Sequence, residues 1–301
     1  MTGDAGQAGP TAPEGATGLR AWWIACVGAV ALIPEANMML VAAGVAFFAM
    51  LSLFPALAAL IAVWGLLADP DVLMRQIEML DHIIPEEVLS IIVGQVTALL
   101  QTSPDKLTLT GLVSLLLAIW SARAGVAALI IGLNMIHGYA RRGSVRHYAT
   151  AALLTLALFG VAVVSLVLLL ALPIFLRIFP PGQMTGVLVE LGRWIGVICV
   201  LLAGLALLYR YGPNTTKDAR LKWITPGAGV AIALWFVSSW GLTIYLTNFG
   251  SINEVYGSIG AAIALLIWLF VSAISILLGA AINVQLDRAR SGQLSVSQFL
   301  P

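Results

Sequence analysis

The sequence predicts an all-α polytopic membrane protein with about six transmembrane helices. Of its 301 residues, 60% are hydrophobic and only 10% are charged, whereas soluble domains carry roughly a quarter charged residues. Its apolar runs far exceed the roughly ten residues of a barrel strand. Because the bilayer core offers the backbone no hydrogen bonds, these runs are expected to form helices.

The N-terminal region is expected to lie outside the bilayer core. Residues 1–18 are rich in Gly, Ala, Pro and Thr, with no large apolar side chain after the initial Met, which predicts a disordered cytoplasmic tail. Residues 21–33 are apolar but too short to span, and Pro34 ends them. With Trp22 and Trp23 at headgroup depth, this segment is predicted to be an interfacial helix, although it could instead join the first span.

Six longer apolar segments follow, most of them long enough to span with tilt: 38–68, 107–137, 147–178, 186–210, 223–248 and 256–286. They are expected to form one transmembrane domain over residues 19–290, followed by a cytoplasmic tail at 291–301. In the polar insert 69–106, apolar residues recur at helical spacing on both sides of Pro85. This pattern predicts two short amphipathic helices, about 71–82 and 86–101, in the first outer loop.

The distribution of Lys and Arg predicts the orientation. Ten of them fall in the N-terminal flank, the 138–147 and 210–222 loops and the C-terminus, and four fall in the alternate loops. Short cytoplasmic loops carry such an excess of positive charge. Both termini are therefore predicted to be cytoplasmic.

Arg123 lies near the middle of the second span, where a charge costs from a few to more than about ten kcal/mol. It is expected to meet water, backbone carbonyls, an inward-reaching Glu or an anionic ligand. At about 100° per residue, Asn134 lies only about 20° from it around the helix, with Trp120 and His137 within roughly 60°. These four residues are the candidate substrate-binding set for an anionic headgroup or solute. Alternatively, Arg123 caps helix carbonyls or snorkels.

Two further groups of charged residues are candidates. Glu254, in the loop before the last span, could form an ion pair or gate with Arg193 or Arg177, or could remain a solvated turn carboxylate. Four basic residues near the 210–222 loop could contact lipid phosphates, although the positive-inside bias alone would also produce them: Arg210, Lys217, Arg220 and Lys222. On the last span, close helix packing explains small and polar residues such as Gly279 and Asn283.

No motif indicates a cofactor, a metal site or a catalytic centre. His82, His137 and His147 have no HxH or HExxH spacing, and Cys26 and Cys199 lie far apart in apolar surroundings as packing residues. The chain has no GxxxxGK[ST] loop for a nucleotide and no broad basic face for nucleic acid. The sequence therefore predicts a membrane protein that is not an enzyme and has no nucleic-acid partner.

Four strings occur in an order that resembles a known family: AAGVAFFAMLSLFP, LAIWSARAGVAALIIGLN, LYRYGPN and YGSIGAAIALLIWLFVSAISILLGAAIN. Over about residues 19–290 the chain is similar to the YihY/virulence factor BrkB family, once labelled ribonuclease-BN-like. The resemblance implies six transmembrane helices in the bacterial inner membrane, and the functions proposed for the family include resistance to host defences and lipid or solute export. The chain departs from the family pattern at Phe47 and Phe48, where a Tyr pair is usual, and at Ala281, where Glu is usual.

The expected function is a transporter or flippase-like mover of an anionic lipid or amphiphile through a central cavity. Membrane lipids are the expected partners, and a homo-oligomer is left open. The alternative is a membrane scaffold or envelope-assembly factor that transports nothing. A water-filled lateral opening at Arg123 would favour the mover, and a dry Arg123 satisfied by carbonyls would favour the scaffold.

Overall fold

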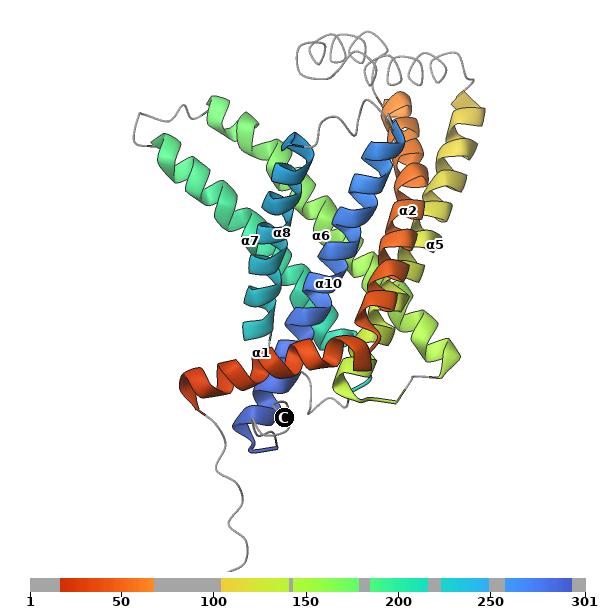
Figure 1. Cartoon of the computed structure of the whole chain (residues 1–301). Coiled ribbons are helices and arrows are strands. Elements are labelled where there is room, and N and C mark those ends of the chain that lie inside the picture. The colour runs from red at the N-terminus through yellow and green to blue at the C-terminus, as the bar shows by residue number, and fades with distance from the viewer. Residues whose placement is uncertain are drawn as a thin grey trace, which may run out of the picture. The chain divides into compact units, whose positions relative to one another are not determined.

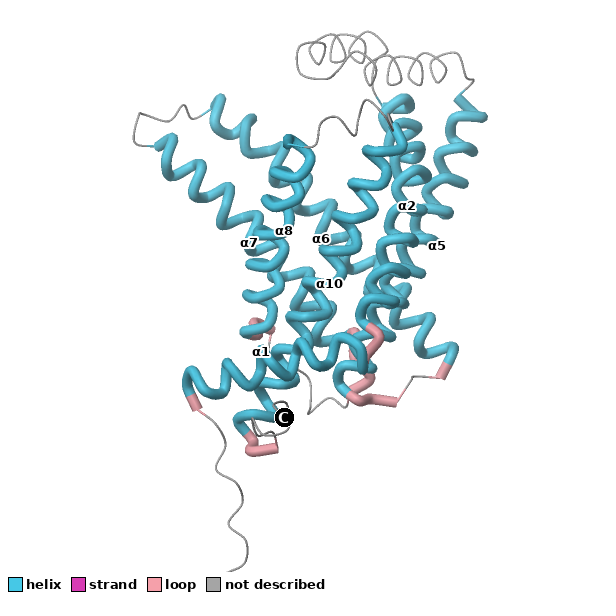
Figure 2. The backbone as a smooth tube through the Cα atoms, viewed as in Figure 1, coloured by secondary structure: helices cyan, strands magenta, loops and turns pink. Residues whose placement is uncertain are grey.

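The computed structural model describes residues 17–67, 104–140, 143–178, 185–215, 223–248 and 258–293. Within these ranges the regular structure is entirely α-helical (Figures 1 and 2), which confirms the predicted all-α class. The helices are α1 (Gly18–Glu35), α2 (Met38–Leu67), α5 (Pro104–His137), α6 (Ser144–Ile178), α7 (Thr185–Tyr211), α8 (Pro226–Asn248) and α10 (Ser258–Arg290).

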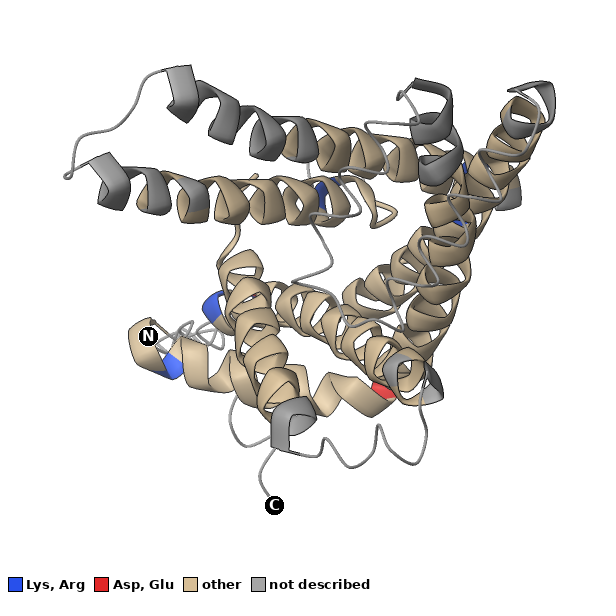
Figure 3. Cartoon of the chain, turned by 90° about the horizontal axis from the view of Figure 1, so that it is seen from above, with Lys and Arg blue, Asp and Glu red and all other residues tan. Residues whose placement is uncertain are grey.

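All seven of these helices are long and apolar enough to cross a membrane. Six of them, α2 to α10, match the six predicted spans to within a few residues at each end. The described helices carry few charged side chains, as the view from above shows (Figure 3). The predicted amphipathic helices at 71–82 and 86–101 lie outside the described residues, as do most of the two predicted tails.

Helix α1 is longer than predicted, because Pro34 lies inside its last turn instead of ending it. The helix ends where Asn37 adopts a left-handed φ of 47°, a conformation common after a helix C-terminus. The carbonyl of Asn37 then accepts the Val41 N–H at 3.0 Å and begins α2. Figure 1 shows α1 lying across α10. The mean hydropathy of α1 is the lowest among the seven candidate membrane spans of the described residues. Its interfacial position stays a prediction.

The contacts divide the chain into two compact units. The larger unit comprises Met1–Ala46 and Val126–Pro301, and the smaller unit is Phe47–Gly125. The predicted division into one transmembrane domain and two tails therefore stays a prediction.

In the larger unit, α10 is the central helix, packing against α8 and α1, while α6 packs against α7. The core includes large side chains with almost no exposed surface, contributed by α2, α5, α7 and α10: Met38, Leu133, Tyr209 and Leu277. A Cβ added at Gly279 of α10 would lie 2.7 Å from the Cβ of Ala231 in α8. This confirms the close packing predicted for the small face of the last span.

Polar side chains tie α8 to α10 within the apolar bundle. The indole N–H of Trp235 donates to the Ser272 hydroxyl at 3.1 Å, and that of Trp268 donates to the Ser239 hydroxyl at 3.0 Å. At the start of α8, the Asn283 side chain accepts the Gly227 N–H at 2.7 Å. Such bonds satisfy polar groups that have no water partner in a bilayer.

Cys26 and Cys199 are free and exposed. The packing role predicted for them is therefore wrong. The apolar surroundings of each cysteine in the sequence include outward-facing positions such as Trp23 and Ile198, and a membrane protein leaves such positions on its surface because lipid covers them.

Candidate functional site

Arg123 and Trp120 lie together on α5 in the smaller unit. The Cζ atom of Arg123 lies 4.9 Å from the centroid of the Trp120 ring, within the range of a cation–π contact. Arg123 is partly buried, whereas Trp120 is 68% exposed. The apolar part of α5 runs from Thr108 to His137, and Arg123 lies near the middle of this segment.

Asn134 is engaged in the packing of the larger unit. It is 2% exposed, and its side-chain oxygen accepts the backbone N–H of Asn214 at 2.6 Å. The Asn214 amide in turn donates to the Ala140 carbonyl at 3.0 Å. These bonds tie the segment after α7 to the segment after α5. The substrate-binding role of Asn134 stays a prediction.

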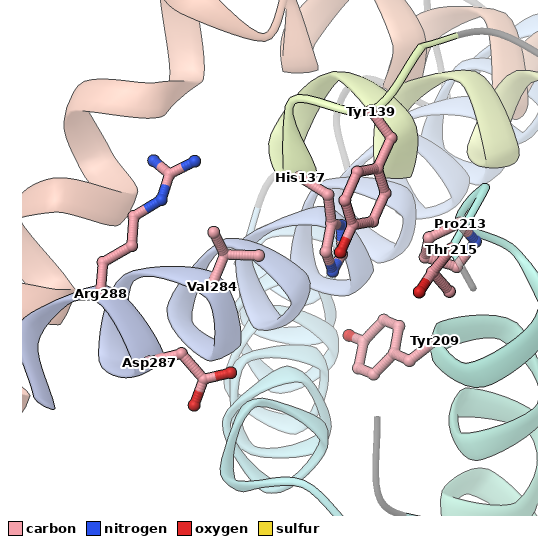
Figure 4. Close-up of a pocket in the computed structure, with 8 residues that line it drawn as sticks. All are labelled: His137, Tyr139, Tyr209, Pro213, Thr215, Val284, Asp287 and Arg288. Carbon is pink, nitrogen blue, oxygen red and sulfur yellow. The ribbon is translucent and has the colours of Figure 1, made fainter. Parts of the chain in front are cut away.

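His137 lines a pocket of about 210 Å³ within the larger unit, where residues from the ends of three helices meet. Figure 4 shows the imidazole of His137 and the phenol rings of Tyr139 and Tyr209 close together, with the carboxylate of Asp287 set apart from them. The lining residues come from α5 and the segment after it, from α7 and the segment after it, and from the last turns of α10: His137, Tyr139, Tyr209, Pro213, Thr215, Val284, Asp287 and Arg288.

The polar groups of this pocket are positioned by bonds to the helices that carry them. The Nδ1 atom of His137 lies 2.8 Å from the Leu133 carbonyl oxygen, and the ring stacks on Tyr139 with centroids 5.3 Å apart. The hydroxyl of Tyr209 donates to the Ile276 carbonyl at 2.7 Å and so joins α7 to α10. Asp287 is exposed at the edge of the pocket.

Arg210 lies close to two aromatic rings near the end of α7. Its Cζ atom lies 4.9 Å from the centroid of the Trp223 ring and 6.0 Å from that of Tyr211. The other three predicted phosphate ligands, Lys217, Arg220 and Lys222, lie outside the described residues. A contact between Arg210 and lipid phosphates stays a prediction.

The predicted gate also stays a prediction. Glu254 lies outside the described residues, and Arg193 lies in α7 with a side chain that is likewise not described. Among the described residues, no three of the types His, Cys, Asp and Glu lie close enough together to hold a metal ion.

Reasoning from the sequence missed Tyr209, Thr215 and Asp287 as pocket residues. They lie far from His137 along the chain, and only the packing of α7 and α10 beside the end of α5 brings them to it. One signal in the sequence could have suggested that these residues meet. The segments that end at α5, α7 and α10 all end on the side of the membrane that the Lys and Arg distribution predicts to be cytoplasmic.

Comparison with known proteins identifies relatives of the chain. A family model described as Virulence factor BrkB matches residues 30–298. The chain is 29% identical over 263 residues to YfkH of Bacillus subtilis (strain 168), a protein named as ribonuclease-like, and the alignment covers 82% of this chain and 90% of YfkH.

Matches to membrane proteins of Xanthomonas are shorter. A UPF0761 membrane protein of Xanthomonas oryzae pv. oryzae (strain PXO99A) is 35% identical over 98 residues, which cover 30% of this chain and 23% of that protein. A UPF0761 membrane protein of Xanthomonas campestris pv. campestris (strain B100) is 33% identical over 106 residues, 33% of this chain and 24% of that protein. No solved structure matches the chain. Because the family model covers nearly the whole sequence, the chain belongs to the virulence factor BrkB (YihY) family of integral membrane proteins.

Proposed function

We propose that this protein moves an anionic lipid or amphiphile across the bacterial inner membrane, with Arg123 binding the anionic headgroup. The observation that carries the proposal is a partly buried arginine whose Cζ atom lies over an exposed indole in the middle of an apolar helix. A charge at that depth is costly, and charged residues retained within spans commonly mark a substrate path.

The geometry of the Arg123–Trp120 pair suits an amphiphile. The Arg123 Cζ atom lies over the Trp120 ring, and a guanidinium carries planar N–H donors that match the oxygens of a phosphate or carboxylate. In the smaller unit, the α2 and α5 segments expose large apolar side chains such as Phe54, Leu112 and Leu116. A lipid whose acyl chains cover this surface would keep its headgroup beside Arg123.

The alternative, a scaffold without transport, is favoured by a different observation. Three buried amides of the larger unit, Asn134, Asn283 and Gln285, all bond to neighbouring segments and so hold the bundle together. Interhelical bonds of this kind are common in membrane proteins of every function. They are compatible with transport, so the mover remains our proposal.

Lipid scrambling in liposomes tests the proposal. The full chain is reconstituted, and the movement of labelled anionic and zwitterionic lipids is compared for the wild type, Arg123→Ala and Arg123→Lys. We expect the wild type to move the anionic lipid faster, and Arg123→Ala to lose about tenfold or more of that rate, the effect of removing a charge-assisted hydrogen bond. Arg123→Lys should keep part of the rate, because it keeps the charge but loses the planar pair of donors.

The matched control removes an exposed arginine that lies near the start of another helix, α6. Arg146 is exposed in the first turn of α6, so Arg146→Ala should leave the rate unchanged. If neither lipid moves in the wild type while the reconstituted protein is folded, the transport proposal fails and the scaffold is preferred. An unchanged rate in Arg123→Ala would remove Arg123 from the mechanism.

A further inference from the structure

Helix α1 lies across α10 at a steep angle to it (Figure 1). Its 18 residues extend about 27 Å along the helix axis, which is less than the roughly 30 Å of a bilayer's hydrocarbon core. The helix that it crosses, α10, is 33 residues long and suits a span. A helix turned across a span runs along the surface of the membrane.

One face of α1 is packed on α10. A Cβ atom added at Gly28 would lie 3.0 Å from the side chain of Gln285, and the Nε2 atom of Gln285 donates to the Gly28 carbonyl at 3.1 Å. An apolar cluster joins the start of α1 to the last turns of α10: Ala21, Ile24, Ala25, Leu286 and Ala289. These contacts fix which side of α1 faces away from the protein.

The opposite face of α1 is apolar and exposed. Four exposed residues recur every three or four positions along it: Leu19, Trp23, Cys26 and Val30. At about 100° per residue they lie within about 60° of one another around the helix. The adjacent Trp22 instead packs against the buried clusters. A helix exposed to water carries polar residues on its outer face, so this face is suited to lipid.

Three arginines flank the junction between the start of α1 and the end of α10. Arg20 lies in the first turn of α1, and Arg288 and Arg290 lie in the last turn of α10. Arg20 and Arg290 are exposed, and Arg288 is half-buried. The first turn of α1 contains no acidic residue, and Asp287 offsets one of the charges at the end of α10. The junction therefore carries a net positive charge.

We propose that α1 and the last turn of α10 form a docking surface for a leaflet of anionic phospholipid. The exposed face of α1 lies at the boundary between headgroups and acyl chains, with the indole of Trp23 at the interface, where such rings are enriched. The arginines lie at the level of the phosphates, whose oxygens match guanidinium donors. The negative surface potential of the leaflet attracts each of these charges.

This inference does not depend on the proposed role of Arg123, which lies in the other unit. Attraction to a surface potential requires a bilayer leaflet, whereas a headgroup site at Arg123 would hold a single lipid. The two proposals can therefore fail separately. A docking surface of this kind is compatible with a transporter and with a scaffold.

The depth of α1 in a bilayer can be measured with nitroxide labels on the full chain in nanodiscs that contain phosphatidylglycerol. Single labels are placed at Cys26, at Leu19→Cys or at Val30→Cys, in chains whose remaining cysteines are replaced by serine. Access of each label to oxygen, which concentrates in lipid, and to a water-soluble nickel chelate gives its depth. We expect the three labels at one depth, just below the phosphates.

A pair of labels with the same spacing on α6 is the control. Val145 and Leu156 are exposed apolar residues of this candidate span, and labels at Val145→Cys and Leu156→Cys should differ in depth by up to about 16 Å. A similar difference between the labels at positions 19 and 30 would show that α1 spans the membrane and would overturn the proposal. So would full access of the nickel chelate to all three labels.

A second copy of the chain is the other possible cover for this face. Dipolar coupling between the Cys26 labels of two chains in one nanodisc would identify that cover and would refute docking on lipid. We expect no such coupling.

Hydrogen exchange tests the contribution of the arginines. Exchange of amides in the first two turns of α1 measures their local opening, which lifts Arg20 away from the phosphates. These amides should exchange more slowly in phosphatidylglycerol than in phosphatidylcholine nanodiscs. Arg20→Gln should reduce the ratio of the two rates about fivefold, the effect of one charge at an anionic surface. Arg290→Gln should have the same effect on the last amides of α10.

Arg146→Gln is the matched control, because Arg146 is exposed in the first turn of a different helix. It should leave the exchange ratios of α1 and α10 unchanged. Equal exchange of the wild type in the two lipids would contradict docking on an anionic leaflet. Wild-type ratios in both Arg20→Gln and Arg290→Gln would contradict it as well.

Discussion

Replacing Gly279 with Ala is expected to destabilise the protein, because α8 and α10 touch at this glycine. A Cβ atom at position 279 would lie 2.6 Å from the Tyr209 hydroxyl oxygen and 2.7 Å from the Cβ of Ala231, whereas ordinary van der Waals contact begins at 3.4 Å. The new atom would also overlap the backbone carbonyl of Gly227. A backbone atom cannot rotate away, so α8 itself has to move.

The expected magnitude follows from three contributions. Overpacking a tight contact costs about 1–3 kcal/mol, while Ala in place of Gly inside a helix restores about 1 kcal/mol. Moving α8 also weakens the bond from the Gly227 N–H to Asn283, now 2.7 Å long, at a cost of about 1 kcal/mol. The free energy of unfolding should therefore fall by about 2 kcal/mol.

Gly229 provides the matched control, because it lies on the exposed side of α8 and a Cβ there would meet nothing within 4 Å. Gly229→Ala should raise the free energy of unfolding by up to about 1 kcal/mol. Both variants can be compared by equilibrium unfolding in mixed micelles, followed by tryptophan fluorescence. Effects of the same sign and size would refute the close contact between α8 and α10.

Three further predictions concern the same bundle and its orientation. Asn283→Leu should lower the free energy of unfolding by about 1–3 kcal/mol in the same unfolding assay, because it leaves the Gly227 N–H without its acceptor and removes the amide that donates to the Thr225 hydroxyl. Ser239→Ala should cost only about 0.6 kcal/mol, the mean for interhelical hydrogen bonds in a membrane bundle, since it removes only the acceptor of Trp268. A cysteine introduced at the exposed Ser291, in a chain whose natural cysteines are replaced by serine, should react with a membrane-impermeant maleimide in inside-out vesicles only; reaction in intact spheroplasts would contradict a cytoplasmic C-terminus.

The transmembrane helices could be predicted from the sequence because the bilayer imposes one requirement on all of them. A run of about twenty apolar residues can satisfy its backbone only as a helix, so hydropathy gives both the type and the approximate ends of α2, α5 and α10. The extent of α1 could not be predicted in this way. Its last turn depends on how Pro34 and Asn37 continue into α2.

The candidate site was less predictable, because a helical wheel places residues on a face but does not show what covers that face. Trp120 and Arg123 are three positions apart on one helix, so their contact could be expected. The helical wheel places Asn134 on the same polar stripe, yet its side chain bonds to the segment after α7. Asp287 and His137 line the same pocket only because separate helices pack together. A local sequence pattern does not predict such packing.

The most direct test of the central claim is native mass spectrometry of the full chain in micelles that hold equal amounts of an anionic and a zwitterionic lipid. If Arg123 binds an anionic headgroup, the wild type and Arg146→Ala should retain the anionic lipid preferentially. Arg123→Ala should lose that preference, and Arg123→Lys should keep part of it. An unchanged preference in Arg123→Ala would contradict the proposed headgroup site.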